Sequence, residues 1–357
     1  MKGVILAGGS GTRLRPLSYT GPKQLIPIAN KPNIVYCIDD VREAGVTEVG
    51  VILGNNMPEK VRELLGDGSR YGVKITYIVQ GEPKGIAHAV LCAKEFVAGD
   101  PFVVYLGDNL LRGGIRGMVR EFTEKKPSAA IALCKVKNPS AFGVAVLDSA
   151  GRVVRCVEKP KEPISDLAVI GIYLFSPRVF DVIARLKPSA RGELEITDAI
   201  TGVIEGGGSV HSWLVEGWWK DTGKPEDILE ANHLVLDELE GSIEGTVEEG
   251  AQVAGRVSIG AGTVVEKGSR IRGPALIGAN CRIGPNAYVG PYTSIGDHCW
   301  IADSEVEGSM VLDHVTIQCR RKLADSIVGP HSQVLSAEGL VPEGARVVIG
   351  DYTTVRI

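Results

Sequence analysis

The sequence has no long apolar stretch, no run of basic residues and no paired cysteines. A membrane-spanning helix needs about 20 consecutive apolar residues, so none is expected. The net charge of −4 comes from 39 basic and 43 acidic residues, and without a basic run a nucleic-acid partner is not expected. The apolar run at the N-terminus is too short for a signal peptide. We therefore expect a cytoplasmic protein with no nucleic-acid or membrane partner.

Cysteine chemistry is also largely excluded. The seven cysteines are an odd number, and neither Cys-x-x-Cys nor His-Glu-x-x-His occurs. They are expected to be small buried apolar residues in a reducing compartment, not disulfides or zinc ligands.

What the sequence does have is enough length and apolar content for two cores. It has 357 residues, of which 44% are hydrophobic. Up to about residue 220, short apolar runs alternate with amphipathic stretches, which predicts an α/β domain with a mostly parallel sheet covered on both faces. The predicted strands are Gly3–Ala7, Glu48–Leu53, Lys74–Val79 and Phe102–Leu106, and the predicted helices are Pro32–Ala44, Pro58–Leu65 and Gly85–Val97. Four later strands, at 129–136, 143–147, 153–157 and 169–175, have less helix between them and predict a mixed second half of the sheet, where a sugar would sit.

The last third of the chain repeats every six residues. One aliphatic residue recurs in step at Val247, Val253, Ile259, Val265, Ile271, Ile277, Ile283, Val289, Ile295 and Ile301. A six-residue repeat predicts a parallel β-helix whose aliphatic residues stack inside. The step slips between Val306 and Val311, which predicts a loop bulging from a coil. We expect one domain at 1–241, including a linker helix at 225–239, and a second at 242–357.

A glycine-rich loop follows the first predicted strand. It reads Gly8-Gly9-Ser10-Gly11-Thr12-Arg13 and is followed by Gly21-Pro22-Lys23-Gln24-Leu25. Glycine lets backbone N–H groups close around phosphate oxygens, and the two cations could neutralise phosphate charge. The spacing matches neither Gly-x-Gly-x-x-Gly nor the Walker pattern, so the loop alone favours a tight turn and a phosphate cradle equally.

The longer string GGSGTRLRPLSYTGPKQLIPIANKP, at 8–32, resembles the sugar-nucleotide pyrophosphorylase family. The likeness covers roughly residues 1–225, and the C-terminal part is similar to members that add a left-handed hexapeptide-repeat β-helix. The Lys-Gln-Leu after the loop is typical of thymidylyltransferase members. The resemblance implies an enzyme that joins dTTP and α-D-glucose 1-phosphate to give dTDP-glucose and pyrophosphate with Mg²⁺, by in-line attack of the sugar phosphate on the α-phosphate.

Two aspartates are the candidate metal ligands. Asp108 follows a buried strand, where ligands bind in open sheets, although its position alone is equally suited to a helix cap. The resemblance identifies Asp108 in Tyr-Leu-Gly-Asp-Asn and Asp221 in Trp-Trp-Lys-Asp-Thr-Gly as the metal pair. Without the resemblance, Asp221 would be a turn residue before a glycine.

The other site residues are implied by the same resemblance. The catalytic residues are Arg13, Lys23 and Lys159. The nucleotide-binding residues are Leu6, Gly8, Gly9, Gly11, Thr12, Gln24, Gln80, Pro83, Gly85 and Asp108, and the two glutamines match positions that read the base edge. The sugar-phosphate residues are Gly143, Glu158, Lys159, Val169, Arg191 and Trp219. Two departures from the family are Phe142, where tyrosine is common, and His88, where glutamine is common.

Several alternatives stay open at this stage. A glutamine amide suits uracil as well as thymine, so UTP could replace dTTP, and an amino-sugar phosphate could replace glucose 1-phosphate. The β-helix could serve homo-oligomer assembly or regulation, or carry an acetyltransferase activity; assembly or regulation is favoured. A non-catalytic nucleotide-sensing subunit is disfavoured because the loop arginine and the metal aspartate are both present.

Overall fold

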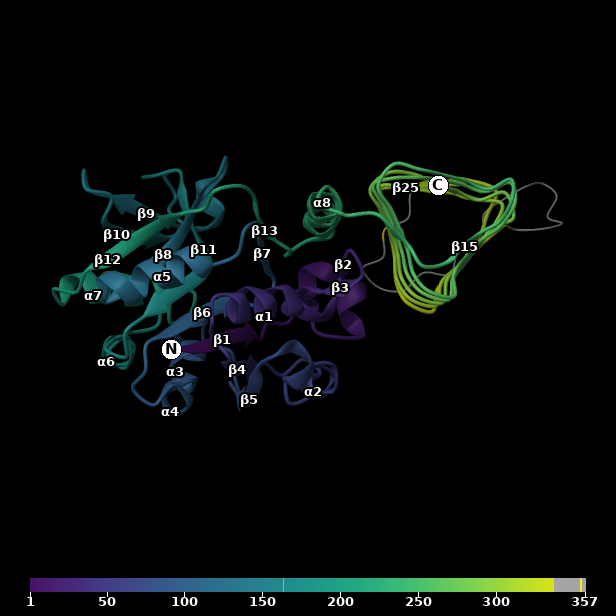
Figure 1. The fold of residues 1–357 in the computed structure, drawn as a ribbon. Coiled ribbons are helices and arrows are strands. Elements are labelled where there is room, and N and C mark those ends of the chain that lie inside the picture. The colour runs from purple at the N-terminus through teal and green to yellow at the C-terminus, as the bar shows by residue number, and fades with distance from the viewer. Residues whose placement is uncertain (163, 337–353, 355–357) are drawn as a thin grey trace. The chain divides into compact units, whose positions relative to one another are not determined.

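The computed structural model describes residues 1–162, 164–336 and 354, and the chain divides into two compact units (Figure 1). The first unit comprises residues 1–11, 21–25 and 33–221. The second comprises residues 12–20, 26–32 and 222–357. The glycine-rich signature string therefore contributes to both units, a division that its sequence does not indicate. The predicted boundary at residue 241 stays a prediction.

The first unit is built on a nine-stranded sheet. Its strands are β1 (Lys2–Ala7), β4 (Glu48–Leu53), β5 (Lys74–Val79), β6 (Phe102–Leu106), β8 (Ala129–Lys135), β9 (Gly143–Leu147), β10 (Val153–Glu158), β11 (Leu167–Phe175) and β12 (Val210–Leu214). The main path runs β10-β9-β11-β6-β1-β4-β5, and β8 pairs with β11 and β12. Strands β5, β4, β1 and β6 are parallel, whereas β11 is antiparallel to β6, β8 and β9. The predicted mixed sheet, with its parallel first half, is confirmed.

Helices cover both faces of this sheet. They are α1 (Asn33–Glu43), α2 (Pro58–Leu65), α3 (Ile86–Cys92), α4 (Lys94–Val97), α5 (Arg116–Lys125), α6 (Val179–Ile183) and α7 (Ile196–Glu205). Short 3-10 turns add η1 (Thr12–Leu14), η2 (Leu17–Tyr19), η3 (Lys23–Leu25), η4 (Ser69–Tyr71) and η5 (Pro139–Ala141). The helix predicted at Gly85–Val97 is broken at Ala93, where α3 ends and α4 begins.

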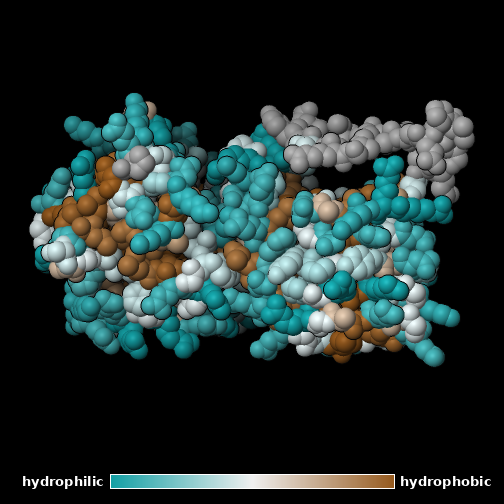
Figure 2. Space-filling view, turned by 90° about the horizontal axis from the view of Figure 1, so that it is seen from above, coloured by the Kyte–Doolittle hydropathy of each residue, from teal (hydrophilic) through white to brown (hydrophobic). Residues whose placement is uncertain are grey.

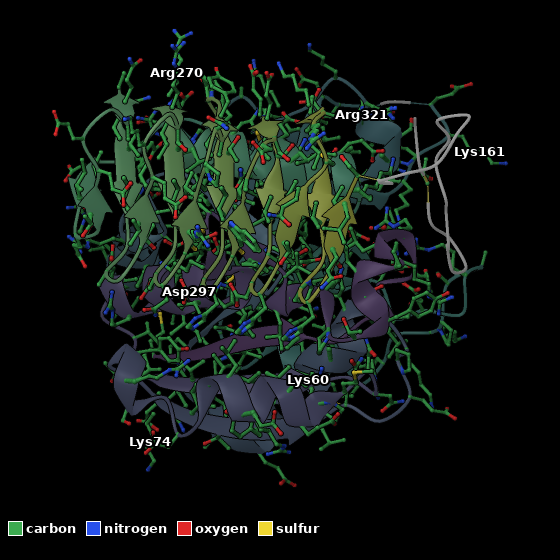
Figure 3. All side chains as sticks on the ribbon, turned by 90° about the vertical axis from the view of Figure 1, so that its right-hand side faces the viewer. Lys60, Lys74, Lys161, Arg270, Asp297 and Arg321 are labelled. Atoms are coloured by element: carbon green, nitrogen blue, oxygen red, sulfur yellow. The ribbon has the colours of Figure 1, made fainter. Side chains whose placement is uncertain are left out.

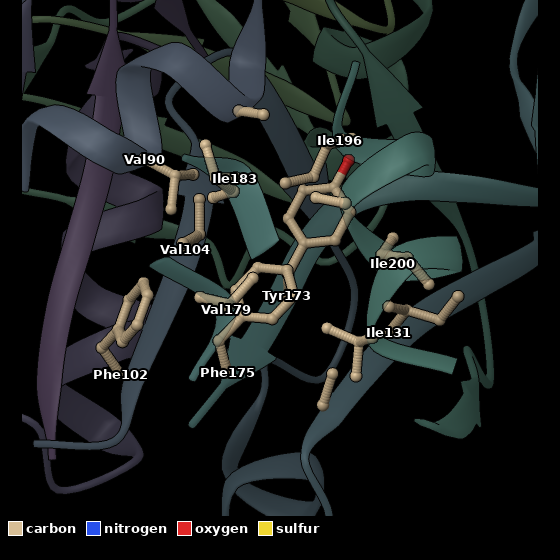
Figure 4. Packing of buried hydrophobic residues seen from close by; sticks show 14 of the residues in the cluster. Val90, Phe102, Val104, Ile131, Tyr173, Phe175, Val179, Ile183, Ile196 and Ile200 are labelled. Carbon is tan, nitrogen blue, oxygen red and sulfur yellow. The ribbon is translucent and has the colours of Figure 1, made fainter. Parts of the chain in front are cut away.

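The core on one face is rich in aromatic side chains (Figure 4). Phe102 of β6 stacks on Phe180 of α6 with ring centroids 5.2 Å apart, and Tyr173 stacks on Phe175 at 5.9 Å. All four side chains are at most 3% exposed. Burying such rings stabilises the strands whose carboxyl ends carry the candidate site.

The second unit contains helix α8 (Pro225–Leu236), the hairpin β2 (Pro27–Ile28) with β3 (Lys31–Pro32), and a parallel β-helix that appears triangular when seen along its axis (Figure 1). Three parallel sheets form its sides. The first holds β14 (Ser242–Ile243), β17 (Val257–Ile259), β20 (Ala275–Ile277), β23 (Thr293–Ile295), β26 (Met310–Val311) and β29 (Ile327–Val328). The second holds β15 (Thr246–Val247), β18 (Val264–Val265), β21 (Arg282–Ile283), β24 (Trp300–Ile301), β27 (Thr316–Gln318) and β30 (Gln333–Leu335). The third holds β16 (Gln252–Ala254), β19 (Arg270–Arg272), β22 (Tyr288–Val289), β25 (Glu305–Glu307) and β28 (Lys322–Ala324).

The predicted repeat sets the register of these coils. Ile259 pairs with Ile277 and Ile277 with Ile295, so one coil uses three hexads and the aliphatic residues stack in the interior. In β19, Ile271 is buried while Arg270 points away from the stacked strands (Figure 3). This alternation is the physical reason for the repeat, and the predicted hexapeptide β-helix is confirmed.

The slip in the repeat differs from the expectation. Ile295 pairs with Val311 and Ile301 with Ile317, so the coil is shorter there than in the preceding turns. The predicted bulging loop is wrong, because the chain omits residues at the slip instead of inserting them.

In the view of Figure 2, hydrophilic residues cover much of the visible surface. Large exposed hydrophobic side chains among the described residues are spread over several elements, namely Tyr19, Val79, Val154, Ile164, Leu214, Ile243, Val247 and Leu335. Among the described residues, no helix is long and apolar enough to cross a membrane.

Candidate active site

Three parallel strands place the nucleotide-site residues at one edge of the sheet. Strand β1 runs into Gly8, strand β6 runs through Gly107 to Asp108, and strand β5 runs into Gln80. Leu6 pairs with Leu106, and the N–H of Gly107 donates to the carbonyl of Leu6 at 3.0 Å. Because carboxyl ends of parallel strands meet at one edge, the loop, the aspartate and the glutamine converge there.

Lys23 and Asp108 form the central charged pair. The Nζ of Lys23 donates to Oδ2 of Asp108, and their side chains are 18% and 10% exposed. Two opposite charges that are this well shielded from water attract strongly. The pair joins the second stretch of the signature to the end of β6, and the phosphate role of Lys23 and the metal role of Asp108 stay predictions.

A two-stranded ribbon brings the second aspartate to the same place. Strand β13 (Trp219–Asp221) pairs antiparallel with β7 (Asn109–Leu111), and Asp221 lies opposite Asn109. Asn109 donates from Nδ2 to Oδ1 of Asp108 at 3.3 Å and accepts from Nε1 of Trp219 at 2.7 Å. Asn109 therefore links the two strands that carry the candidate metal ligands.

Asn109 and Trp219 were assigned differently by sequence. Asn109 was not predicted as a site residue, although it directly follows Asp108. Trp219 was predicted as a wall of the sugar pocket, and its ring also meets Phe142 edge-on with centroids 5.5 Å apart. The position where the family has tyrosine thus packs on the tryptophan instead of offering a hydroxyl.

The two glutamines both meet the glycine-rich loop. Gln24 is 1% exposed, and its Nε2 donates to the carbonyl of Gly8 at 2.7 Å. Its Oε1 is buried with no hydrogen-bond partner. A Cβ on Gly8 would lie 3.0 Å from Oε1 of Gln80, so a larger residue would crowd that amide.

His88 fixes the other end of Gln80. The Nε2 of Gln80 lies 3.3 Å from Nδ1 of His88 on helix α3 and 3.4 Å from the carbonyl of Gly85. Burial, with a smaller effect of Lys84, lowers the pKa of His88, so the ring is neutral at pH 7 and Nδ1 can accept this hydrogen bond. From the sequence, His88 was expected to point from a helix toward the nucleotide side or to pack; in the structure it lies beside Gln80, a candidate for reading the base.

The sugar-side residues gather where β9, β10 and α7 meet. Gly143 pairs with Glu158, and a Cβ on Gly143 would lie 2.7 Å from Cγ2 of Thr197 and 3.0 Å from Oε2 of Glu158. Thr197 donates to Oε2 of Glu158 at 3.4 Å. Val169, on the neighbouring strand β11, is 3.9 Å from the same Cβ position. Thr197 was missed because nothing in its local sequence sets it apart.

Lys159 has an unusual backbone. Its φ is +40°, a left-handed value that a lysine rarely adopts, and Pro160 follows it. Its N–H donates to the carbonyl of Phe142 at 3.0 Å, and its Nζ is 3.8 Å from Glu158. The predicted role of Lys159 in binding the sugar phosphate stays a prediction.

Arg191 is surrounded by carboxylates. Its guanidinium contacts Glu195 at 2.8 Å, Glu193 at 3.1 Å and Glu158 at 3.5 Å. Burial and the nearby Glu195 raise the pKa of Glu158, while Lys159 and Arg191 oppose that rise. An arginine so paired must exchange carboxylates to bind a phosphate, and its predicted phosphate role stays a prediction.

The remaining nucleotide residues are distributed over both units. Leu6, Gly9 and Gly11 lie in the first unit, at the end of β1 and in the loop after it. Gly85 directly precedes α3, and Pro83 is exposed in the same loop. The N–H of Leu194, in the loop before α7, donates to the carbonyl of Lys84 at 2.8 Å. Thr12 and Arg13 form the exposed turn η1 and belong to the second unit.

Comparison with known families identifies the class of protein. A family model described as nucleotidyl transferase matches residues 2–238, and one described as the GMPPB C-terminal domain matches residues 271–356. The chain belongs to the nucleotidyl transferase family, so the predicted enzyme class is confirmed.

Relatives of the full chain narrow this class. A low-salt glycan biosynthesis nucleotidyltransferase of Haloferax volcanii is 50% identical over 100% of both chains. A glucose-1-phosphate thymidylyltransferase of Streptomyces griseus is 46% identical, over 100% of this chain and 99% of the relative. The predicted resemblance to the thymidylyltransferase members is confirmed.

Two solved structures each resemble about two thirds of the chain. One, named as a glucose-1-phosphate thymidylyltransferase from Bacillus anthracis in complex with a sucrose, is 40% identical with a TM-score of 0.63, and the match covers 68% of this chain and 98% of that one. A UDP-glucose pyrophosphorylase complexed with UDP-glucose is 26% identical with a TM-score of 0.59, covering 66% and 98%.

Proposed function

We propose that the protein transfers the thymidylyl group of dTTP to α-D-glucose 1-phosphate, giving dTDP-glucose and pyrophosphate. The observation that carries this proposal is the pairing of Lys23 with Asp108 at the edge of the sheet, with Asp221 on the adjoining ribbon. The names of the full-length relatives support the choice of dTTP and glucose 1-phosphate.

The carboxylates suit a metal that arrives with the nucleotide. Among the described residues, no group of three or more histidine, cysteine, aspartate or glutamate side chains could hold a metal ion. Mg²⁺ usually keeps several waters and is bound by one or two carboxylates together with substrate phosphates. Asp108 and Asp221 fit this need, and bound Mg²⁺ would neutralise triphosphate charge and orient the α-phosphate.

The cations and the loop hold the triphosphate. Lys23 and Arg13 would each neutralise phosphate charge, and Asp108 would be available to hold Mg²⁺ when the metal is bound. The oxygen of the sugar phosphate attacks the α-phosphorus in line, and the bond to the pyrophosphate oxygen breaks. No protein nucleophile is needed, so these residues act by positioning and by charge.

The base and the sugar meet different side chains. Oε1 of Gln24 is an unsatisfied acceptor, which the N3–H of thymine or uracil would satisfy. Glu158 accepts hydrogen bonds from sugar hydroxyls, and Lys159 pairs with the sugar phosphate. Thymine and uracil share the edge that Gln24 reads, so UTP is the alternative nucleotide.

The test is pyrophosphate release with Mg²⁺, across dTTP, UTP, ATP, CTP and GTP against glucose, N-acetylglucosamine and mannose 1-phosphates. We expect the maximum at dTTP with glucose 1-phosphate. A maximum elsewhere would overturn the base or sugar assignment, and no release from any pair would overturn the proposed reaction.

A further inference from the structure

The hairpin that follows the signature loop has a strained turn. Pro27 and Ile28 of β2 pair with Pro32 and Lys31 of β3, and the two residues between them have φ values of +45° (Ala29) and +60° (Asn30). A two-residue turn of this kind needs positive φ at both positions, which asparagine tolerates and alanine does not. Contacts outside the hairpin must therefore hold Ala29 in place.

One buried asparagine supplies such a contact. Asn232, on helix α8, is 0% exposed, and its Oδ1 accepts from the N–H of Ala29 at 2.9 Å. The same Oδ1 accepts from Oγ of Ser294 at 2.9 Å, and its Nδ2 donates to the carbonyl of Tyr292 at 3.4 Å. A single amide thus joins the turn to the β23 side of the β-helix.

The neighbouring turn residue reaches the same strand. Nδ2 of Asn30 donates to the carbonyl of Ile295, the last residue of β23, at 2.6 Å. Both residues of the turn are therefore hydrogen-bonded within the second unit, one through Asn232 and one directly. Helix α8 thus holds the backbone of Ala29, and the β-helix holds the side chain of Asn30.

Helix α8 is docked on the β-helix by other residues as well. His233 lies 3.4 Å from the carbonyl of Gly308, and its ring is 4.9 Å from that of Tyr292. The hydroxyl of Tyr292 donates to Oδ1 of Asp237 at 3.0 Å. The hydrogen bond and the ring contact of His233 go to Gly308 and Tyr292, whereas Ala29 is bonded to Asn232, so His233 serves as a control for helix docking.

The held segments adjoin the nucleotide residues along the chain. Only Ile26 separates Leu25, the end of η3 with Lys23 and Gln24, from β2. Residues 12–20, which include Arg13, belong to the same unit as the β-helix, and Leu17 lies 3.7 Å from the Cβ position of Gly329. Because a single residue connects η3 to β2, we expect a displacement of the hairpin to displace Lys23 and Gln24 as well.

We propose that Asn232 is a positioning residue for the nucleotide, which acts through the Ala29–Asn30 turn to make the β-helix part of the apparatus that orders the Lys23–Leu25 segment. This inference rests on the proposed function for its kinetic readout, and it gives the β-helix a role in nucleotide binding besides assembly. It concerns nucleotide affinity and not the sugar-side residues, such as Gly143 on β9, Glu158 on β10 and Val169 on β11.

The test compares three variants of the full chain. Asn232→Ala removes the acceptor for Ala29, Asn232→Asp keeps an acceptor oxygen but loses the donor to Tyr292, and His233→Phe perturbs helix docking alone. For each, KM for dTTP, KM for glucose 1-phosphate, kcat and Tm are measured, together with hydrogen exchange at the Ala29 amide.

For Asn232→Ala we expect KM for dTTP to rise about tenfold while KM for glucose 1-phosphate stays within about twofold, because a buried hydrogen bond and the turn it holds are lost. Faster exchange at Ala29 should accompany it. Asn232→Asp should keep KM for dTTP within about threefold despite a lower Tm, since the acceptor remains. His233→Phe should lower Tm without changing either KM.

Two outcomes would overturn the inference. One is a lower Tm for Asn232→Ala with KM for dTTP unchanged. The other is an equal rise in KM for dTTP and in KM for glucose 1-phosphate in Asn232→Ala, with the same rises in His233→Phe. If the wild-type chain released no pyrophosphate from any substrate pair, the proposed function would fail instead. In that case, hydrogen exchange at the Ala29 amide and the dissociation constant for Mg²⁺–dTTP would test the inference without turnover. If both values were unchanged in Asn232→Ala, the inference would be overturned.

Discussion

The two units treat their buried polar side chains differently. In the β-helix, Ser304 donates to the carbonyl of Ala302 at 2.8 Å and accepts from the N–H of Cys319 at 2.9 Å. Thr263 likewise donates to Gly278 at 2.7 Å and accepts from Cys281 at 2.9 Å. Each of these buried hydroxyls both donates and accepts a hydrogen bond, and the accepted bond comes from the N–H of the next coil.

In the first unit, buried polar groups are left incomplete or strongly charged. Oε1 of Gln24 has no partner, and the carboxylate of Asp108 lies within the protein against an ammonium. Burying groups that are charged or that lack a hydrogen-bond partner costs free energy. The paired hydroxyls of the β-helix avoid this cost. At the candidate site, the unpaired Oε1 of Gln24 occurs together with the charged pair of Lys23 and Asp108, whereas Oγ of Ser176 is unpaired outside the site, so an unpaired polar atom alone does not locate the reacting site.

The largest effect is expected from a change in the charged pair of Lys23 and Asp108. Asp108→Asn should lower kcat at least about 100-fold, because a metal-ligand carboxylate contributes several kcal/mol to charge stabilisation. Steady-state kinetics at saturating Mg²⁺ measure the effect, and Asp100→Asn, at an exposed position before β6, is the matched control. Unchanged turnover in Asp108→Asn would contradict the metal assignment.

The scaffold should respond in stability and not in chemistry. Ile283 of β21 is 0% exposed inside the β-helix, whereas Ile243 of β14 is 55% exposed. Ile283→Ala should cost about 2–5 kcal/mol of unfolding free energy because it leaves a cavity, and Ile243→Ala less than about 1 kcal/mol. Urea titrations that are followed by hydrogen exchange of the coil amides measure the loss of unfolding free energy in each variant. Equal losses in Ile283→Ala and Ile243→Ala would argue against the stacked interior.

The ribbon between β7 and β13 allows a smaller change. Trp219→Phe keeps an aromatic ring on Phe142 but leaves Oδ1 of Asn109 without its donor. We expect kcat/KM for glucose 1-phosphate to fall about tenfold, since a buried acceptor without a partner costs about 1–3 kcal/mol. Trp213→Phe, where the ring packs on Gly117, serves as the control and should change kcat/KM little.

The smallest expected effect is a pH dependence of nucleotide binding. The pKa of His88 is lowered, so the ring becomes charged only at a pH more acid than its ordinary value. Its protonated Nδ1 can no longer accept from Gln80, and KM for dTTP should then rise about threefold to tenfold as a hydrogen bond is lost. A pH series of KM for wild type and His88→Gln checks this, and the same rise in His88→Gln would exclude His88 as its cause.

Much of the fold could be predicted because local pattern and tertiary role coincide. Strands β4, β5 and β6 begin and end where the apolar runs do, and β4 and β6, inside the sheet, are almost wholly buried. The break in the helix at Ala93 and the shortened β-helix coil could not be predicted. Both depend on packing partners far away in the sequence.

For the candidate site, the sequence singled out Lys23 and Asp108, which pair, and Glu158 and Arg191, which lie together. It missed Asn109 and Thr197, and it named His88 without its contact with Gln80. Hydrogen-bond partners of this kind leave no periodic or glycine-rich pattern. A residue between two assigned motif positions, such as Asn109, was the one that could have been suspected.

The sequence by itself determined the chemistry available: a cationic glycine-rich loop, aspartates near strand ends, and a six-residue repeat that builds a stacked coil. Only the tertiary structure decided the partners, because hydrogen bonds between distant residues depend on three-dimensional placement. It set Asp221 opposite Asn109, enclosed Arg191 in carboxylates, and gave the Ala29 amide to Asn232. The six-residue repeat depends only on contacts between neighbouring coils, whereas the candidate site depends on residues that the whole sheet brings together.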